Sequence, residues 1–337
     1  AAIPALERLS KEGEAGRKKL QKITRFVTVG LALIMSFAYW SSSRSAEATV
    51  LPPAINALVV IFSFTAGSAF IMWLGEQINE RGIGNGISMI IFTGIISRFP
   101  MNIQAIYFTF MQWSQRNIIL AILGVILVMI VFVAIITLVV YIQSAERRIP
   151  VQYAKKVIGR KMYGGQSTYL PIKVNQSGVL PVIFAVSVLM LPSTLISLFG
   201  FQGKVAQWFL NFSSNPLYYV LYALFILAFT FFYSSISFNP IEMANNLQKN
   251  GGFIPGIRPG RPTSTFIGKT SKRLLWFEAL FLVFIVLFPS LLSLLTNSMQ
   301  NIWFGGTSVL IVVGVAMDMI TQLESQLMMR HYKGFLD

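Results

Sequence analysis

The sequence predicts an all-α fold, a polytopic membrane helical bundle with eight spanning helices. Its composition is 55% hydrophobic and only 12% charged, with a mean hydropathy of +0.66, whereas soluble domains usually carry about 25% charged residues. Eight windows are apolar and nearly free of charge, as a span of about 20 residues requires. The Lys and Arg residues between these windows are abundant in every second connection. Together these observations exclude an ordinary soluble enzyme.

Each predicted span has its own justification. The first, second, fourth, sixth and eighth are long apolar windows. The third has only ten apolar residues and counts as a span because the alternation of charge requires it. The fifth contains Pro181 and Pro192, which predict kinks, and the seventh carries Glu278 near its start. The predicted spans are residues 26–43, 53–74, 87–96, 118–143, 179–198, 217–237, 274–295 and 307–328.

The charge pattern predicts the topology. Of the 27 Lys and Arg residues, 23 lie on one side of the predicted bundle and 4 on the other. The positive-inside rule assigns the rich side, with both ends of the chain, to the cytosol. The predicted organisation is a basic cytosolic segment (1–25), spans one to four (26–143), a basic cytosolic loop (144–178), spans five and six (179–238), a second basic loop (239–273), spans seven and eight (274–328) and a cytosolic tail (329–337).

The two basic loops are long for connections in a bundle. The first alternates basic with apolar residues, which is compatible with short strands or a hairpin. In the second, Gly and Pro between residues 251 and 262 exclude a long helix there. Their charges either set the topology alone or also bind an anionic partner such as lipid headgroups or RNA.

Residues for catalysis and metal binding are scarce. The chain has no Cys and a single His, His331, so neither a disulfide scaffold nor a thiolate metal site is expected. The glycine-rich segment 81–86 lacks the Gly-Lys-Ser/Thr ending of a phosphate-binding loop and predicts a tight turn before a helix. Glu278 and Asp318 are either locally paired charges near the interface or ion-coupling groups. We therefore expect no catalytic site, metal or cofactor.

Several motifs go beyond composition and periodicity. They are residues 11–18 (KEGEAGRK), 73–88 (WLGEQINERGIGNGIS), 166–175 (QSTYLP and KVN), 239–240 (NP), 253–260 (FIPGIRPG) and 304–308 (FGGTS). Together they resemble the bacterial SecY family, the central subunit of the protein-conducting channel.

The resemblance implies ten spans arranged as a clamshell of two inverted halves, of which the eight found here are spans three to ten. We therefore expect the chain to be the back part of a longer protein that also supplies two spans and a plug. The first six residues of the chain resemble the end of an apolar segment and lead to the same expectation. The implied function is Sec-dependent export of unfolded polypeptides and lateral insertion of membrane proteins, in the plasma membrane of a bacterium.

The resemblance also implies roles for particular residues. Branched aliphatic side chains of a pore ring form a seal that offers ions no hydration, and the matching residues are Ile87, Ile91, Ile183 and Ile311. The fifth predicted span matches the lateral gate helix, with Pro181, Ser187, Ser193 and Thr194. The residues that match ribosome or motor docking positions are Arg147, Arg148, Lys155, Lys156, Arg160, Lys161, Arg258 and Arg261.

The partners that the resemblance implies are the SecE and SecG subunits, the SecA motor, the ribosome with its RNA and proteins, polypeptides that carry signal sequences, and membrane lipids. Two alternatives belong to other classes. An ion-coupled secondary transporter would depend on Asp318 or Glu278, and a non-conducting scaffold would only dock ribosomes at the membrane.

Overall fold

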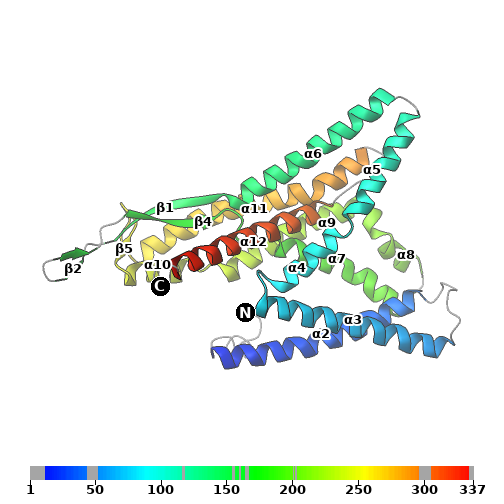
Figure 1. Ribbon diagram of the computed structural model, residues 1–337, viewed down its shortest axis with the longest axis horizontal. Helices are drawn as coiled ribbons and strands as arrows, with labels where there is room; N and C mark the ends of the chain where they lie inside the picture. Colours follow the sequence, from blue (N-terminus) through cyan, green and yellow to red (C-terminus); the bar gives the residue numbers. More distant parts are fainter. Residues whose placement is uncertain are drawn as a thin grey trace. The chain divides into compact units, whose positions relative to one another are not determined.

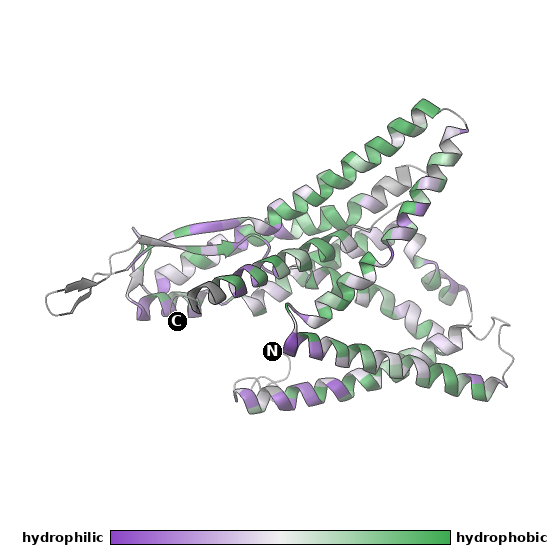
Figure 2. Cartoon of the chain, in the orientation of Figure 1, coloured by the Kyte–Doolittle hydropathy of each residue, from purple (hydrophilic) through white to green (hydrophobic). Residues whose placement is uncertain are grey.

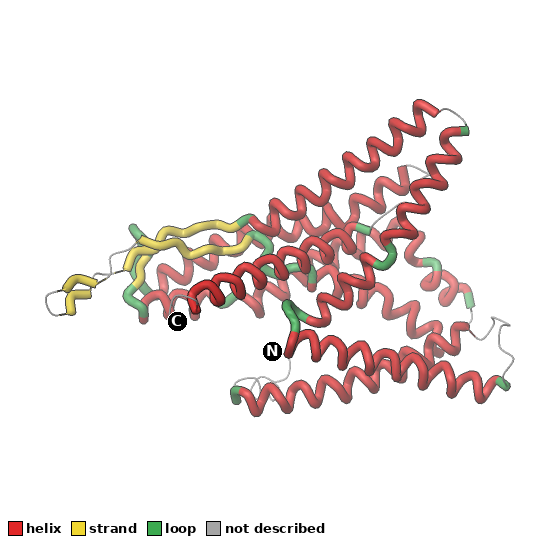
Figure 3. Tube along the Cα trace, in the orientation of Figure 1, coloured by secondary structure: helices red, strands yellow, loops and turns green. Residues whose placement is uncertain are grey.

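The computed structural model describes residues 12–43, 52–115, 118–153, 156–158, 161–163, 167–199, 201, 203–295 and 305–333, and long helices dominate it (Figures 1 and 3). Hydrophobic residues run along these helices, whereas hydrophilic residues gather on β1 and at the start of α2 (Figure 2). Within the described part, seven helical segments are long and apolar enough to cross a membrane: Glu14–Ser41, Ala54–Arg81, Gly86–Phe108, Ala121–Ser144, Leu180–Phe199, Pro216–Lys249 and Gly306–Met328.

These segments confirm the predicted class, a polytopic helical membrane protein, but not the predicted number of eight spans. Seven of the predicted windows lie inside them or extend beyond them by no more than three residues at either end. The remaining window, residues 274–295, forms the second half of helix α11 (Arg261–Leu295) and is not among the seven.

The chain divides into two compact units, which are described one at a time. The first comprises Ala1–Gly94, Val186–Val220 and Asp318–Asp337. Its helices α2 (Glu14–Ser43) and α3 (Pro53–Arg81) form an antiparallel hairpin. Near one end, Arg25 Nη2 lies 2.7 Å from Glu76 Oε2, and in the middle the hydroxyls of Ser36 and Thr65 lie 3.4 Å apart. These contacts set one register for the hairpin, because moving 11 residues forward on α2 moves 11 residues back on α3.

The second unit comprises Ile95–Ala185 and Leu221–Met317. Helix α6 (Ile118–Ser144) packs against α5 (Phe99–Ser114). The sequence did not predict α5, which follows α4 (Gly86–Ile96) after a two-residue turn. Pro100 occupies the first turn of α5, where a missing N–H breaks no helical hydrogen bond.

The remaining helices are α7 (Leu180–Phe199), α8 (Lys204–Leu210), the 3₁₀ turn η1 (Phe212–Ser214), α9 (Pro216–Ser237) and α12 (Gly306–Lys333). Of the two prolines predicted to kink α7, Pro192 lies inside the helix, whereas Pro181 is its second residue. A proline in the first turn fits the helix without a kink, so only Pro192 remains a candidate kink.

The first basic loop forms strands, with which its sequence pattern is compatible. β1 (Glu146–Tyr153) pairs antiparallel with β4 (Ser167–Lys173), from Glu146 opposite Lys173 to Gln152 opposite Ser167. On its other edge β1 pairs with β5 (Gly252–Phe253) from the second loop. β2 (Lys156–Ile158) and β3 (Lys161–Tyr163) form a separate hairpin.

The two basic loops fold as one unit, here called the loop subdomain: β1, β4, β5, helix α10 (Pro240–Lys249) and the start of α11. Alternate residues of β1 and β4 point inward and meet apolar residues of the second loop. The shared core consists of Ile149, Val151, Ile172, Leu247, Ile254 and Ile267. The apolar faces of the two loops are thus buried against each other.

Candidate functional site

The turn between α3 and α4 fixes the position of Ile87 and Ile91. Gly84 takes a φ of +88°, which only glycine adopts easily, and Asn85 Oδ1 caps α4 by accepting from the backbone N–H of Ile87 at 3.0 Å. Asn79 Oδ1 accepts from Gly86 N at 2.8 Å. The segment 81–86 is therefore a tight turn before a helix, as predicted.

A glycine contact brings α4 against α3. A Cβ added to Gly86 would lie 1.9 Å from the carbonyl oxygen of Gly75, so the two backbones touch where α4 begins. Ile87 and Ile91 lie one helical turn apart on α4 and are 63% and 39% exposed. The start of the short third span is thus held by backbone contact with α3. Its Ile87 and Ile91 side chains remain exposed.

Ile183 and Ile311 belong to the second unit. A Cβ on Gly314 of α12 would lie 3.5 Å from Val179 Cγ2, immediately before α7, and 3.4 Å from Gln143 Nε2 at the end of α6. The end of α6 and the start of α7 therefore pack together against α12 there. Ile183 lies one turn beyond Val179, and Ile311 lies three residues before Gly314, so these two residues predicted for the ring occupy neighbouring helices. Ile87 and Ile91 fall in the other unit.

Glu278 forms hydrogen bonds with the segment that leads into the predicted gate helix. Its side chain is fully buried, and its carboxylate accepts from the backbone N–H of Ser177 at 2.8 Å, from that of Gln176 at 3.1 Å and from the Ser177 hydroxyl. Ser271, two turns earlier on α11, donates to Gln176 Oε1 at 3.1 Å. The segment that leads into α7 is thus bound to α11 by four hydrogen bonds.

The sequence singled out Glu278 as an ionisable group but did not find its partners, which are two backbone N–H groups and a hydroxyl about 100 residues away. Asp318, the other acid considered for ion coupling, is exposed on α12. The hydroxyls predicted in the gate helix bond locally: Ser193 and Thr194 both donate to the carbonyl of Met190, at 2.8 and 2.9 Å. Hydroxyls bonded within their own helix leave its surface easier to separate from a neighbour.

The residues of the second loop that were predicted for docking lie on a turn of the loop subdomain. Arg258 is exposed, while its carbonyl accepts from the hydroxyl of the buried Thr263 at 2.9 Å. Gly256 and Gly260 on either side take φ values of +80° and +96°. Arg261, also exposed, begins α11 three residues later. Both guanidinium groups therefore project from a fixed backbone.

The structure describes some of the first-loop residues that were predicted for docking. Arg147 and Arg148 are exposed on β1, and Arg148 forms an ion pair with Glu146 at 2.9 Å. Lys156 and Lys161 lie at opposite ends of the β2–β3 pairing, Lys156 opposite Tyr163 and Lys161 opposite Ile158. Lys155 and Arg160 lie outside the described residues.

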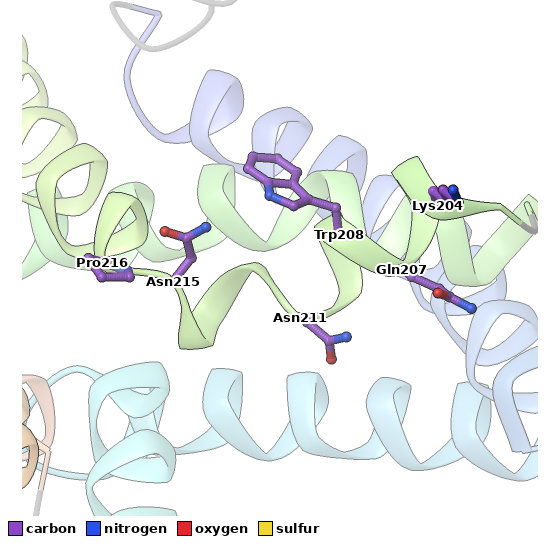
Figure 4. A pocket seen from close by; sticks show the side chains of 6 residues that line it. All are labelled: Lys204, Gln207, Trp208, Asn211, Asn215 and Pro216. Atoms are coloured by element: carbon purple, nitrogen blue, oxygen red, sulfur yellow. The ribbon is translucent and has the colours of Figure 1, made fainter.

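Two pockets are lined by few ionisable side chains. The first, between α8 and the start of α9, is lined by Lys204, Gln207, Trp208, Asn211, Asn215 and Pro216, with Trp208 and Asn211 on opposite sides of the chain (Figure 4). The second, between the end of α4, α5, α6 and α12, is apolar apart from Ser308. Within the described ranges no three His, Cys, Asp or Glu residues gather to hold a metal.

Comparison with known proteins assigns the family. Residues 1–320 match the SecY family. The chain is 44% identical to the protein translocase subunit SecY of Halalkalibacterium halodurans, over 99% of its own length and 79% of that protein. The chain belongs to the SecY family. The SecY subunit of Thermotoga maritima is 40% identical over the whole chain and 76% of its own length.

Solved SecY and Sec61 channels have a similar fold. A structure from a study of the SecY plug domain superposes with a TM-score of 0.62 at 18% identity, covering 92% of this chain and 74% of that one. A structure described as a protein-conducting channel gives 0.59 at 19% identity with the same coverage. The bundle described above is thus the SecY-type bundle.

Proposed function

We propose that this chain is the channel-forming subunit through which unfolded polypeptides are exported and membrane segments leave sideways into lipid. The observation that carries the proposal is its similarity, over almost its whole length, to protein translocase subunits named SecY. The family is a translocation channel and not an enzyme. The energy for transport then comes from a partner, the SecA motor or the translating ribosome.

The pore of this channel is a ring that includes Ile87, Ile91, Ile183 and Ile311. Support comes from α4, where the two isoleucines are presented by a helix whose start touches the backbone of α3 at Gly75. Aliphatic side chains form no hydrogen bonds with a passing chain and do not replace the water around an ion, so they suit many sequences while limiting leakage.

Photocrosslinking tests the pore. A photoreactive residue at Ile183 or Ile87 should crosslink to the mature part of a secretory precursor arrested in the membrane complex. Leu280 is the matched control, an apolar position on α11 that is 60% exposed, and it should crosslink to lipid and not to precursor. If crosslinks to precursor arise only from Arg258 and neither isoleucine reacts, the protein docks partners without conducting polypeptide.

The lateral gate is α7, with Pro181, Ser187, Ser193 and Thr194. The contacts of Glu278 favour a gate helix that is fixed at its start, while Pro192 weakens the helix farther along, because proline removes one backbone hydrogen bond. A channel needs no ion-coupling acid. The hydrogen-bond donors around the Glu278 carboxylate therefore argue against the alternative of an ion-coupled transporter.

The loop subdomain docks the ribosome and the motor. Exposed guanidinium groups on a rigid turn suit carboxylate or RNA phosphate, to which arginine donates two parallel hydrogen bonds. The same proposal includes SecE and SecG as companion subunits and a bacterial plasma membrane in which both ends of the chain face the cytosol, as the positive-inside rule indicates.

Reversing one docking charge should impair transport without disturbing the fold. We expect Arg258→Glu to lower motor-driven export of a precursor into vesicles by about tenfold or more, because a like charge replaces a charge-assisted hydrogen bond. Lys249→Glu is the control, an exposed reversal on α10 in the same loop. Equal loss from both variants would mean that only the net charge of the loop matters. Ribosome binding should also weaken steeply between 50 and 200 mM salt, by roughly 10³-fold for six phosphate contacts.

A further inference from the structure

One exposed stripe of α11 changes from basic to apolar along the helix. Lys269, Lys272 and Arg273 are followed by Trp276, Leu280 and Phe284, and all six are exposed. At 100° per residue these six positions fall within an arc of about 120°. The opposite face is buried, with Ile267, Ser271, Glu278 and Leu282. The stripe is therefore a surface separate from the Glu278 contacts.

The apolar part of the stripe fits the hydrocarbon of a bilayer. Trp276, Leu280 and Phe284 are 57%, 60% and 52% exposed, which is too much contiguous apolar surface to face water. They extend about 12 Å along the helix, within the roughly 15 Å of one leaflet. The ring of Trp276 packs edge-on against Phe231 of α9, with centroids 4.8 Å apart. A tryptophan held in this way is typical of the boundary between hydrocarbon and headgroups.

The basic part lies one turn outside that boundary, at headgroup level. Glu278 is the only acidic residue between Arg261 and Leu295, and it is buried on the other face. None of Lys269, Lys272 and Arg273 forms an ion pair with a residue that the structure describes. Three cations on a single face therefore have no protein anion to neutralise them there.

We infer that Lys269, Lys272, Arg273 and Trp276 form a binding site for an anionic phospholipid of the bilayer. The three cations surround the phosphodiester, Arg273 with its planar fork of donors, while the acyl chains lie along Leu280 and Phe284. Each Lys or Arg close to an anionic membrane surface strengthens binding by about fivefold. The site is independent of the pore and of the docking turn.

Fluorescence quenching at Trp276 measures this site directly. In a variant that keeps Trp276 and carries Phe at the other five Trp positions, the membrane complex is reconstituted in phosphatidylcholine with a fixed fraction of brominated lipid. We expect brominated phosphatidylglycerol to quench Trp276 with an apparent affinity at least about fivefold higher than that of brominated phosphatidylcholine. K269Q/K272Q/R273Q should make the two lipids equal, and high salt should reduce the preference.

A control variant removes the same charge elsewhere. K18Q/K19Q/K22Q neutralises three exposed cations on α2 and should leave the preference at Trp276 unchanged. If the two triple variants behave alike, the preference comes from net charge and the site does not exist. If neither brominated lipid quenches Trp276, protein covers this face, and the inference is overturned.

Discussion

Glu278→Ala is expected to destabilise the protein by about 3 kcal/mol or more. The substitution leaves the backbone N–H groups of Gln176 and Ser177 and the Ser177 hydroxyl without their acceptor. Each buried polar group that loses its partner costs about 1–3 kcal/mol, and the fully buried side chain leaves a cavity behind. The measurement is the loss of folded complex with temperature or denaturant in detergent, followed by tryptophan fluorescence.

The conservative variant separates hydrogen bonding from charge. Glu278→Gln keeps one acceptor oxygen in place, so we expect it to recover more than half of the stability lost in Glu278→Ala. Asp318→Asn changes an exposed acid and should stay within about 0.5 kcal/mol of the parent. A Glu278→Ala protein as stable as the parent would show that these hydrogen bonds do not hold the start of α7.

The same variants distinguish a channel from an ion-coupled transporter. A transporter that moves ions through Glu278 or Asp318 loses its activity when the acid is neutralised. A channel needs only the geometry at the start of α7, so Glu278→Gln and Asp318→Asn should both keep most precursor export in a vesicle assay. Export and stability should then fall together in Glu278→Ala.

Local patterns in the sequence were sufficient for seven of the eight predicted spans and for the turn before α4. Apolar windows free of charge coincide with seven membrane-crossing segments, because a spanning helix must satisfy its backbone internally and cover it with apolar side chains. The segment 81–86 carries its own signal, since Gly84 takes positive φ and Asn85 caps the helix. Helix α5 was missed because Arg98 and Arg116 lie at the two ends of residues 97–117, and this pattern indicates a connection between two spans.

Features that depend on distant segments could not be predicted in this way. The loop subdomain buries Val151 and Ile172 of one loop with Leu247 and Ile267 of the other, and no periodicity within either loop reveals its partner. Glu278 accepts hydrogen bonds from backbone N–H groups. Every sequence has such groups, so no residue pattern predicts this contact. The mutual arrangement of the four ring isoleucines likewise depends on how helices pack, and their assignment rests on family resemblance.

Two glycines show why particular short motifs mark this family. Gly86 is the first residue of α4 and Gly306 the first residue of α12. A Cβ at either would lie 1.9 Å from a backbone oxygen, that of Gly75 or of Ile285. Each helix therefore starts in direct contact with the backbone of an earlier one, and only glycine permits so close an approach.

Gly86→Ala is accordingly expected to displace α4 or to destabilise the first unit by about 3 kcal/mol or more. The added methyl group meets the carbonyl of Gly75, which belongs to a helix backbone and cannot move aside as a flexible side chain would. Because α4 carries Ile87 and Ile91, the variant should also leak ions through a resting channel. Thermal unfolding and vesicle ion flux measure the two effects.

Two other glycines provide a graded comparison in the same region. The tightest contact of a Cβ on Gly75 would be with the flexible end of Ile90, at 3.3 Å, so Gly75→Ala should cost less than about 1.5 kcal/mol. Gly94, also in α4, has nothing within 4 Å of an added Cβ, and alanine there should stabilise the helix by up to about 1 kcal/mol. The predicted order of stability is Gly94→Ala, then Gly75→Ala, then Gly86→Ala. A Gly86→Ala protein that is as stable as Gly94→Ala would mean that α4 does not rest on α3 through this backbone contact, and the placement of Ile87 and Ile91 would then need another cause.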